Sequence, residues 1–182
     1  MNSAGLRWVR WRARLGFPVA AICLWFARPT ARSILAGAAI AVVGLAIRAA
    51  AAGHLRKGDV LATTGPYART RNPLYLGSAL LAVGFVTASR SWVAVALVAS
   101  YYLALYPFLM RREEAELRAS FGASYDEYAK RVPLFWPGLR KQSGSGGRRF
   151  SFAQYARNRE YRVAIGVAAL LAALGALSIW RK

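Results

Sequence analysis

Two sections of the chain combine polar, aromatic and ring-constrained residues in a way that could build a ligand site. The first, residues 59–77, reads DVLATTGPYARTRNPLYLG. Gly65-Pro66 predicts one turn, and Asn72-Pro73 predicts a second break immediately before an apolar segment. A loop that only joins two helices needs a single turn. This section is therefore either a shaped pocket wall or a connecting loop whose tyrosines anchor it at a membrane surface.

The second section, residues 111–137, gathers most of the acidic side chains of a strongly basic chain. It holds five of the seven acidic residues, namely Glu113, Glu114, Glu116, Asp126 and Glu127. A carboxylate here could bind an amine or a ribose diol. Equally, it could belong to a solvated helix face on which Glu114 pairs with Arg118 one turn later. The residues alone leave both interpretations open.

The second section also carries a regular apolar pattern. Leu117, Phe121, Tyr125, Tyr128 and Val132 recur at steps of three or four residues. This spacing places them on one face of a helix. It predicts a helical stripe that lies along the membrane or the rest of the domain, with an interruption at Gly122.

Five apolar segments surround these sections and must position them. They cover residues 15–27, 34–52, 74–88, 92–110 and 163–180. A helix needs about 20 residues to cross the hydrocarbon core, so the second, fourth and fifth segments are long enough or nearly so. The first and third are short. We predict an all-α, polytopic membrane protein with about five transmembrane or membrane-embedded helices.

Composition and charge favour the same class of protein. The chain has 182 residues, of which 57% are hydrophobic, and a formal net charge of +19. Its arginines flank apolar segments, which favours contact with anionic lipid headgroups over nucleic acid binding. If the N-terminus is cytoplasmic and all five segments cross, 20 Lys and Arg residues lie inside and 5 outside, with Arg48 in a span. The two polar sections then both face the cytoplasm.

Single ionisable residues give weaker signals. With Cys23 and His54 as the one cysteine and the one histidine, we predict neither a disulfide framework nor a metal site. Arg48 lies near the end of the second apolar segment, where it could face a cavity or extend its charge to the membrane surface.

The predicted organisation has four parts. Residues 1–33 form a basic arm and a first membrane helix, and residues 34–137 form the core. Residues 138–150 form a flexible basic linker. Residues 151–182 form an interfacial stretch and a last membrane helix. In that helix, Ala168, Ala172 and Ala176 are spaced by four residues, and small residues so placed allow close helix packing.

Taken together, the two polar sections resemble the isoprenylcysteine carboxyl methyltransferase family, which is related to the phospholipid methyltransferases. Residues 65–77 look like its GPY-x3-R-[HN]-P-x-Y-x-G signature, and residues 113–133 resemble its EE-x2-L-x3-FG-x2-Y-x2-Y-x3-VP segment. The resemblance covers roughly residues 48–137. It implies a helical membrane enzyme with a cofactor pocket at the cytoplasmic face, which transfers a methyl group from S-adenosylmethionine to the carboxylate or amine of a lipid-like acceptor.

The resemblance also implies site residues. The S-adenosylmethionine site would comprise Asp59, Val60, Leu61, Ala62, Tyr67, Asn72, Pro73, Leu74, Tyr75 and Glu113. Candidate contacts to the acceptor are Arg71, Arg111, Arg112 and Glu114. Leu109 stands where eukaryotic members have an arginine that meets the substrate carboxylate, so the acceptor stays open. We identify no catalytic base. The expected partners are the lipid bilayer and the acceptor, with no nucleic acid, and the oligomeric state stays open.

Two other functions are compatible with the sequence. Sterol reductases carry a similar R-[HN]-P-x-Y run, so the chain could be a membrane reductase that uses NADPH. It could also be a non-catalytic membrane protein, which would bind no nucleotide-like ligand. Cofactor titration separates these alternatives from a methyltransferase.

Overall fold

A computed structural model describes residues 16, 18–56, 60–138 and 149–181 of the chain. These residues form helices joined by turns and short loops, and they include no strand, so the all-α prediction is confirmed for this part of the chain. The elements are a helix at residues 18–25, α2 (Ala31–His54), the 3-10 turn η1 (Gly65–Ala68), α3 (Pro73–Ser89), α4 (Trp92–Phe121), α5 (Ala123–Arg131), α6 (Phe152–Arg157) and α7 (Tyr161–Trp180).

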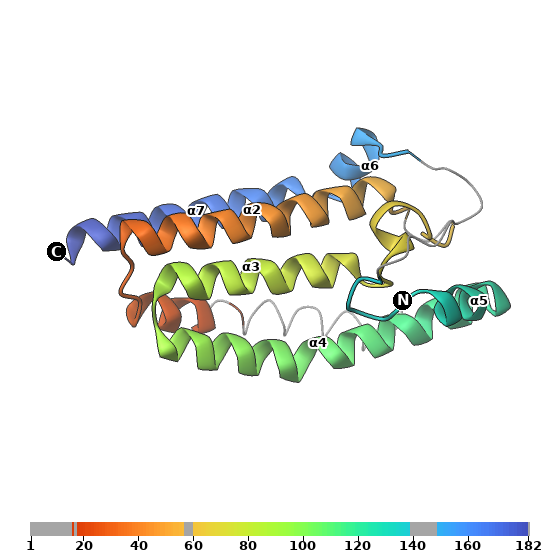
Figure 1. Cartoon of the computed structure of the whole chain (residues 1–182), viewed down its shortest axis with the longest axis horizontal. Helices are drawn as coiled ribbons and strands as arrows, with labels where there is room; N and C mark the ends of the chain where they lie inside the picture. The colour runs from red at the N-terminus through yellow and green to blue at the C-terminus, as the bar shows by residue number, and fades with distance from the viewer. Residues whose placement is uncertain (1–15, 17, 57–59, 139–148, 182) are drawn as a thin grey trace.

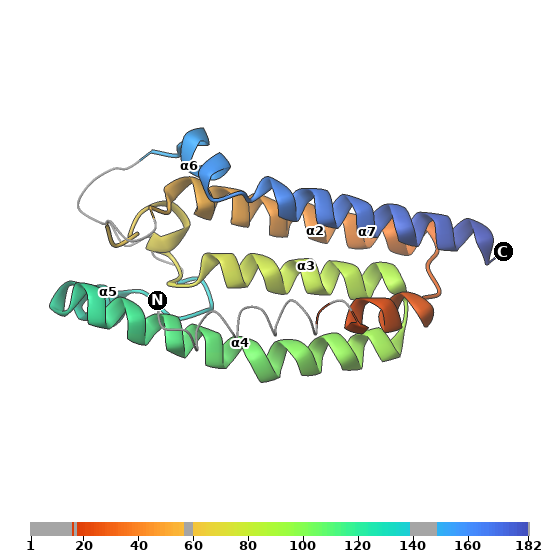
Figure 2. The same cartoon turned by 180° about the vertical axis from the view of Figure 1, so that it is seen from behind.

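The long helices lie side by side along the long axis of the molecule (Figures 1 and 2). The loop after α2, the short helices α5 and α6, and the start of α7 gather at one end, which we call the loop end. Among the described helices, α2, α4 and α7 are long and apolar enough to cross a membrane. Helix α3 is apolar but has 17 residues.

Several predicted breaks are found where the sequence places them. Thr30, directly after Pro29, caps α2 through a reciprocal pair of hydrogen bonds with Ser33. Pro73 occupies the first position of α3, where the missing N–H costs no hydrogen bond. Gly122, with a φ of 53°, ends α4 and precedes α5, so the predicted interruption is confirmed.

Helix α4 is longer than the predicted segment 92–110. It continues without a break to Phe121, so Glu113 and Glu114 lie on the same helix as the residues of the apolar segment. A carboxylate at this position is therefore held by the helix and not by a mobile loop.

Helices α2 and α3 approach each other closely because glycines face one another. A Cβ atom on Gly37 would lie 2.3 Å from the carbonyl oxygen of Gly84, and one on Gly44 would lie 2.9 Å from that of Gly77. Real Cβ atoms do not come so close to backbone. The pair of helices that carries the loop between them is thus packed backbone against backbone.

Helix α7 packs through leucines. Leu174 is fully buried with Ala27 and Ala88, and Leu171 and Leu177 pack against that cluster. The alanine stripe of the sequence prediction, Ala168, Ala172 and Ala176, is exposed instead. The close packing that this spacing allows is thus not used within the described part of the chain, because the larger side chains of α7 bury more apolar area.

Candidate functional site

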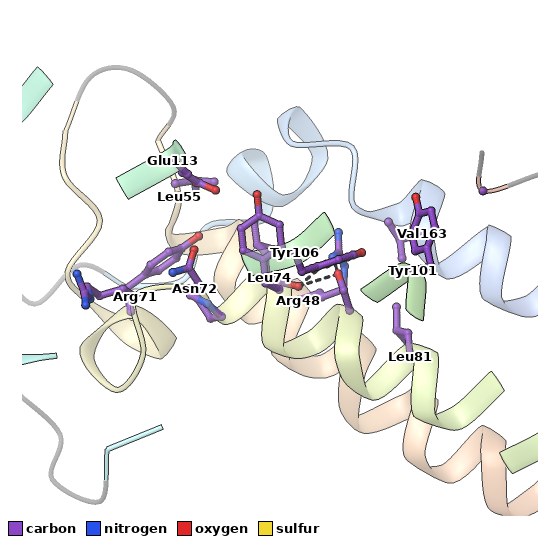
Figure 3. A pocket seen from close by; sticks show the side chains of 15 residues that line it. Arg48, Leu55, Arg71, Asn72, Leu74, Leu81, Tyr101, Tyr106, Glu113 and Val163 are labelled. Atoms are coloured by element: carbon purple, nitrogen blue, oxygen red, sulfur yellow. Dashed lines mark hydrogen bonds between the residues drawn. The ribbon is translucent and has the colours of Figure 1, made fainter. Parts of the chain in front are cut away.

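A cavity of about 660 Å³ lies between the loop end and the middle of the helices. Figure 3 shows Asn72 and Glu113 at one end, Arg48 in the middle, and Leu81 and Val163 at the other end. Its lining comes from several separate parts of the chain and comprises Gly16, Arg48, Leu55, Tyr67, Arg71, Asn72, Pro73, Leu74, Tyr75, Ser78, Leu81, Tyr101, Tyr106, Glu113 and Val163.

A smaller cavity of about 300 Å³ adjoins the first at the loop end. The two cavities share Leu55, Tyr67, Arg71, Asn72 and Glu113. The rest of the smaller lining is Arg56, Val60, Leu61, Ala62, Glu114, Glu116, Leu117, Ser120, Phe121, Tyr125 and Tyr128. The two polar sections of the sequence therefore meet around adjoining spaces, and the predicted convergence of Tyr67 and Glu113 is confirmed.

The smaller cavity is rich in carboxylates for a basic protein. Three of the seven acidic residues of the chain, Glu113, Glu114 and Glu116, line it, whereas its lining has two arginines, Arg56 and Arg71. Arginines pair with two of these carboxylates, Arg71 and Arg118 with Glu114, and Arg112 with Glu116. Glu113 is exposed at the junction of the two cavities, where its carboxylate could meet a cationic group of a ligand.

The loop of the first section is held by the segment that follows α5, which we call the return segment (residues 132–138). The Arg71 N–H donates to the Pro133 carbonyl over 2.9 Å, and the Gly138 N–H donates to the Arg69 carbonyl over 2.8 Å. Asn72 adds a side-chain hydrogen bond of 3.0 Å from Nδ2 to the Leu134 carbonyl. These bonds fix the backbone on both sides of Arg71, which lines both cavities.

Tyr67 is positioned through its backbone. The Tyr128 hydroxyl donates to the Tyr67 carbonyl over 2.7 Å, and Tyr128 belongs to a buried cluster with Tyr125 and Val132. Leu117 and Phe121 pack against the same cluster, so the predicted stripe is confirmed. Burial raises the pKa of the Tyr67 hydroxyl above its usual value, and the nearby Glu113 carboxylate raises it further. Tyr67 therefore stays a neutral hydrogen-bond donor at physiological pH.

Arg71 and Glu114 form an ion pair at the wall of the smaller cavity. Arg71 Nη1 bonds Glu114 Oε1, and Arg118 lies 3.5 Å from the same oxygen. The i, i+4 pairing of Glu114 with Arg118 was one of the two interpretations of this carboxylate, and it occurs together with the cavity contact. The Arg71 Nε atom is buried without a hydrogen-bond partner in the described structure.

The remaining candidate residues fall into three groups. Pro73, Leu74 and Tyr75 line the larger cavity, and Val60, Leu61 and Ala62 line the smaller one. Arg111 and Arg112 line neither of these two cavities; Arg112 pairs with Glu116 at 3.0 Å. Successive residues of a helix point about 100° apart, so Glu113 faces the cavities while Arg111 is turned away. Asp59 lies outside the described residues.

Sequence reasoning left open the role of Arg48, and it missed the partner. Arg48 lines the larger cavity and makes a two-point ion pair with Glu160, with Nε–Oε2 and Nη2–Oε1 distances of 3.0 and 2.8 Å. Nη1 also donates to the Leu74 carbonyl and to Ser78 Oγ, over 3.1 and 2.6 Å. An arginine at this depth required a partner, and that requirement was the available signal.

Comparison with known proteins agrees with this arrangement of motifs. Residues 30–124 match the phospholipid methyltransferase family. The chain belongs to this family. The matched region contains α2, α3, α4 and the loop between them, and thus most of the lining of both cavities. The resemblance drawn from the sequence motifs is confirmed.

Three curated relatives are similar in sequence to part of the chain. The chain is 32% identical over 103 residues to cobalt-zinc-cadmium resistance protein CzcN of Cupriavidus metallidurans, and this region covers 57% of the chain and 47% of the relative. It is 37% identical over 84 residues to nickel-cobalt-cadmium resistance protein NccN of Alcaligenes xylosoxydans xylosoxydans, covering 46% and 39%. It is 38% identical over 80 residues to protein-S-isoprenylcysteine O-methyltransferase of Schizosaccharomyces pombe, covering 42% and 33%.

The matched region thus spans about half of each relative's length or less. No solved structure matches the chain.

Proposed function

We propose that the chain is an integral membrane methyltransferase that uses S-adenosylmethionine and a lipid-like acceptor. The proposal is supported chiefly by the adjoining cavities that the two family motifs enclose, with the exposed Glu113 carboxylate at their junction. S-adenosylmethionine carries a sulfonium and an ammonium group, so it suits such a lining. When bound, it would supply an electrophilic methyl group.

The residues at the smaller cavity fit the different parts of this cofactor. Glu113 is an exposed carboxylate that would bind the ammonium group or the ribose hydroxyls. Arg71, which lines both cavities, would donate from its guanidinium group to the cofactor's carboxylate. Leu61, Leu117 and Phe121 offer apolar surface for the adenine ring.

The larger cavity would hold the acceptor. It shares Tyr67, Asn72 and Glu113 with the smaller cavity and continues to apolar residues between the helices. An acceptor whose polar end lies at the shared residues would have its reacting atom beside the cofactor site. Positioning of this kind is the main contribution that the protein can make to a methyl transfer.

The Glu113 carboxylate also distinguishes this proposal from a reductase. NADPH carries several phosphate charges, which a carboxylate repels. Glu113 at the junction of the two cavities therefore favours the sulfonium cofactor over the dinucleotide. The membership of this methyltransferase family supports a protein embedded in a bilayer, with about five helices in it. The excess of Lys and Arg residues in the polar sections beside the site supports a site that faces the cytoplasm.

The test is a titration of purified protein in lipid nanodiscs with labelled S-adenosylmethionine. We expect saturable binding that Glu113→Gln weakens about 10- to 100-fold, as the loss of a charge-assisted hydrogen bond would. Glu127→Gln is the matched control, because Glu127 pairs with Lys130 on the surface. This variant should bind S-adenosylmethionine as the native protein does. Unchanged binding in Glu113→Gln, or binding of NADPH in place of S-adenosylmethionine, would contradict the proposal.

A further inference from the structure

The C-terminal segment lies beyond residues 30–124, the part that matches the family, yet it contributes to the larger cavity. Val163 of α7 lines the cavity, and Glu160 directly before α7 binds the cavity residue Arg48. The lining of the cavity is therefore completed by a part of the chain that the family motifs do not include.

The pair of Arg48 and Glu160 joins three helices at one guanidinium group. Arg48 comes from α2, its Nη1 atom donates to Leu74 and Ser78 of α3, and its other nitrogens donate to Glu160 at the start of α7. The stem of Arg48 passes over Gly77, where a Cβ atom would lie 2.4 Å from Arg48 Cγ. The guanidinium is thus fixed in one place at the cavity wall.

Contacts other than this ion pair attach α7 to the rest of the protein. Leu174 and its neighbours bury the far half of the helix, and Arg181 donates to the carbonyls of Ala27 and Trp25. Near the loop end, Asn158 Nδ2 donates to the carbonyls of Ala52 and Leu55 over 2.8 and 2.9 Å. A buried ion pair adds little stability compared with apolar residues of the same volume, so attachment alone does not explain the pair.

The position of the pair in the cavity gives a better explanation. Arg48 lies between the polar end with Asn72 and Glu113 and the apolar end with Leu81 and Val163 (Figure 3). The Arg48 and Glu160 side chains are 15% and 12% exposed. Covering an uncompensated guanidinium here with hydrocarbon would be costly, because the charge would lose its water. Such a guanidinium would also attract an anionic group from the residues that the two cavities share into the larger cavity. Glu160 cancels that charge.

We propose that Glu160 is a specificity-determining residue: by neutralising Arg48, it reserves the inner half of the larger cavity for the uncharged hydrocarbon part of an amphiphile. The acceptor would then lie with its polar end at Glu113 and its chain against Leu81 and Val163. This inference rests on the proposed function, because it takes the larger cavity as the acceptor site.

The test compares two probes that differ only in charge, a 16-carbon diazirine fatty acid and the corresponding alcohol. The full chain is reconstituted in phosphatidylcholine vesicles, irradiated, and mapped by mass spectrometry for adducts near Leu81 and Val163. In the native protein we expect the alcohol to label this region at least as well as the acid. In Glu160→Gln we expect the acid-to-alcohol ratio to rise about tenfold, since a free guanidinium binds the carboxylate.

Two variants keep the result interpretable. Glu127→Gln makes the same chemical change in an ion pair whose side chains are 62% and 70% exposed, and it should leave the ratio unchanged. The double variant Arg48→Met with Glu160→Met removes both charges at similar volume, so it should keep the native ratio even if Glu160→Gln folds poorly. A native ratio in a folded Glu160→Gln, or a raised ratio in the double variant, would overturn the inference.

The same samples separate this inference from the proposed function. If the native protein binds no S-adenosylmethionine, the proposed function fails, whereas the probe ratios still report on the charge of the cavity. If the cofactor binds and the ratios do not respond to Glu160→Gln, the specificity role of Glu160 fails alone.

Discussion

Adjacent carboxylates on α4 have different surroundings, although they are the same residue type. Glu114 is bound by Arg71 and lies near Arg118, whereas Glu113 is exposed at the junction of the two cavities. The difference follows from the 100° turn between neighbouring helical residues. Glu114 therefore pairs with Arg71, and Glu113 faces the cavities in which we propose that the cofactor and the acceptor bind.

The Tyr128 hydroxyl gives a prediction at the residue scale. Tyr128→Phe removes the hydrogen bond to the Tyr67 carbonyl and leaves a buried acceptor without its donor, which costs about 1–2 kcal/mol. We expect the melting temperature to fall by about 3–6 °C and cofactor affinity to fall with it. Tyr161→Phe, at an exposed tyrosine, is the control. Equal melting temperatures for the two variants would show that the bond is unimportant.

The buried tyrosines also predict a pH dependence. Burial raises the pKa of Tyr67 and of Tyr128 above the usual value of 10.0. Above pH 10 the unfolded chain loses these protons while the folded chain retains them. The folded state then binds more protons, so stability falls as pH rises, by up to about 1.4 kcal/mol per pH unit for each tyrosine. Melting curves between pH 8 and 11 should show this slope, and Tyr128→Phe should make it shallower.

Sequence motifs identified the residues at the junction of the cavities but missed much of the larger one. Tyr67, Asn72 and Glu113 belong to local patterns with turns and helix spacing. Ser78 and Glu160 carry no such pattern, because their role depends on Arg48, which comes from a different helix. Side chains that act through contacts between distant segments are invisible until those segments are placed.

At the scale of the helices, the contact between α2 and α3 determines the geometry of the loop between them. The close contact uses glycines spaced by seven residues on both helices, Gly37 with Gly44 and Gly77 with Gly84. The alanine stripe of α7 has an equally regular helical spacing, yet its residues are exposed in the described part of the chain. Small residues at helical spacing show that close packing is possible without showing which helix is the partner. The sequence alone could therefore not single out the glycines.

Gly77→Ala tests the contact between these helices. The new methyl group would lie 2.8 Å from the Gly44 carbonyl and 2.4 Å from Arg48 Cγ, so α2 and α3 must separate, at a cost of about 1–3 kcal/mol. We expect a lower melting temperature and weaker cofactor binding.

Gly166→Ala is the matched control for this prediction. Apart from its chain neighbours and the backbone of its own helix, no described atom lies within 4 Å of the position a Cβ on Gly166 of α7 would occupy. Alanine favours a helix by about 0.5–1 kcal/mol over glycine. The control should therefore be neutral or stabilising. A destabilisation equal to that of Gly77→Ala would mean that the contact is not the cause.

For the whole molecule, the alternation of helix directions brings both polar sections to one end (Figure 1). The grouping of apolar segments predicted this arrangement, because an even number of crossings separates the two sections. The number of helices that cross the bilayer, and the side on which the loop end lies, are predictions that rest on the distribution of arginines.

Cysteine labelling tests the orientation. In a Cys23→Ala background, Ser124→Cys marks the loop end on α5 and Ala31→Cys marks the opposite end at the start of α2, both at exposed positions. With a cytoplasmic site, a membrane-impermeant maleimide should label Ala31→Cys on intact cells and Ser124→Cys only after permeabilisation. The reverse pattern would place the site outside.

The return segment determines what kinds of genetic change the site can tolerate. The partners it gives to Arg69, Thr70, Arg71 and Asn72 are all main-chain atoms of residues 133–138. Replacing Leu134 or Phe135 by another residue leaves those carbonyl groups in place, so amino-acid exchanges there should be accepted freely. Inserting or deleting a single codon would shift every bond out of alignment at once. Natural variation in the return segment should therefore preserve its length far more strictly than its amino-acid sequence.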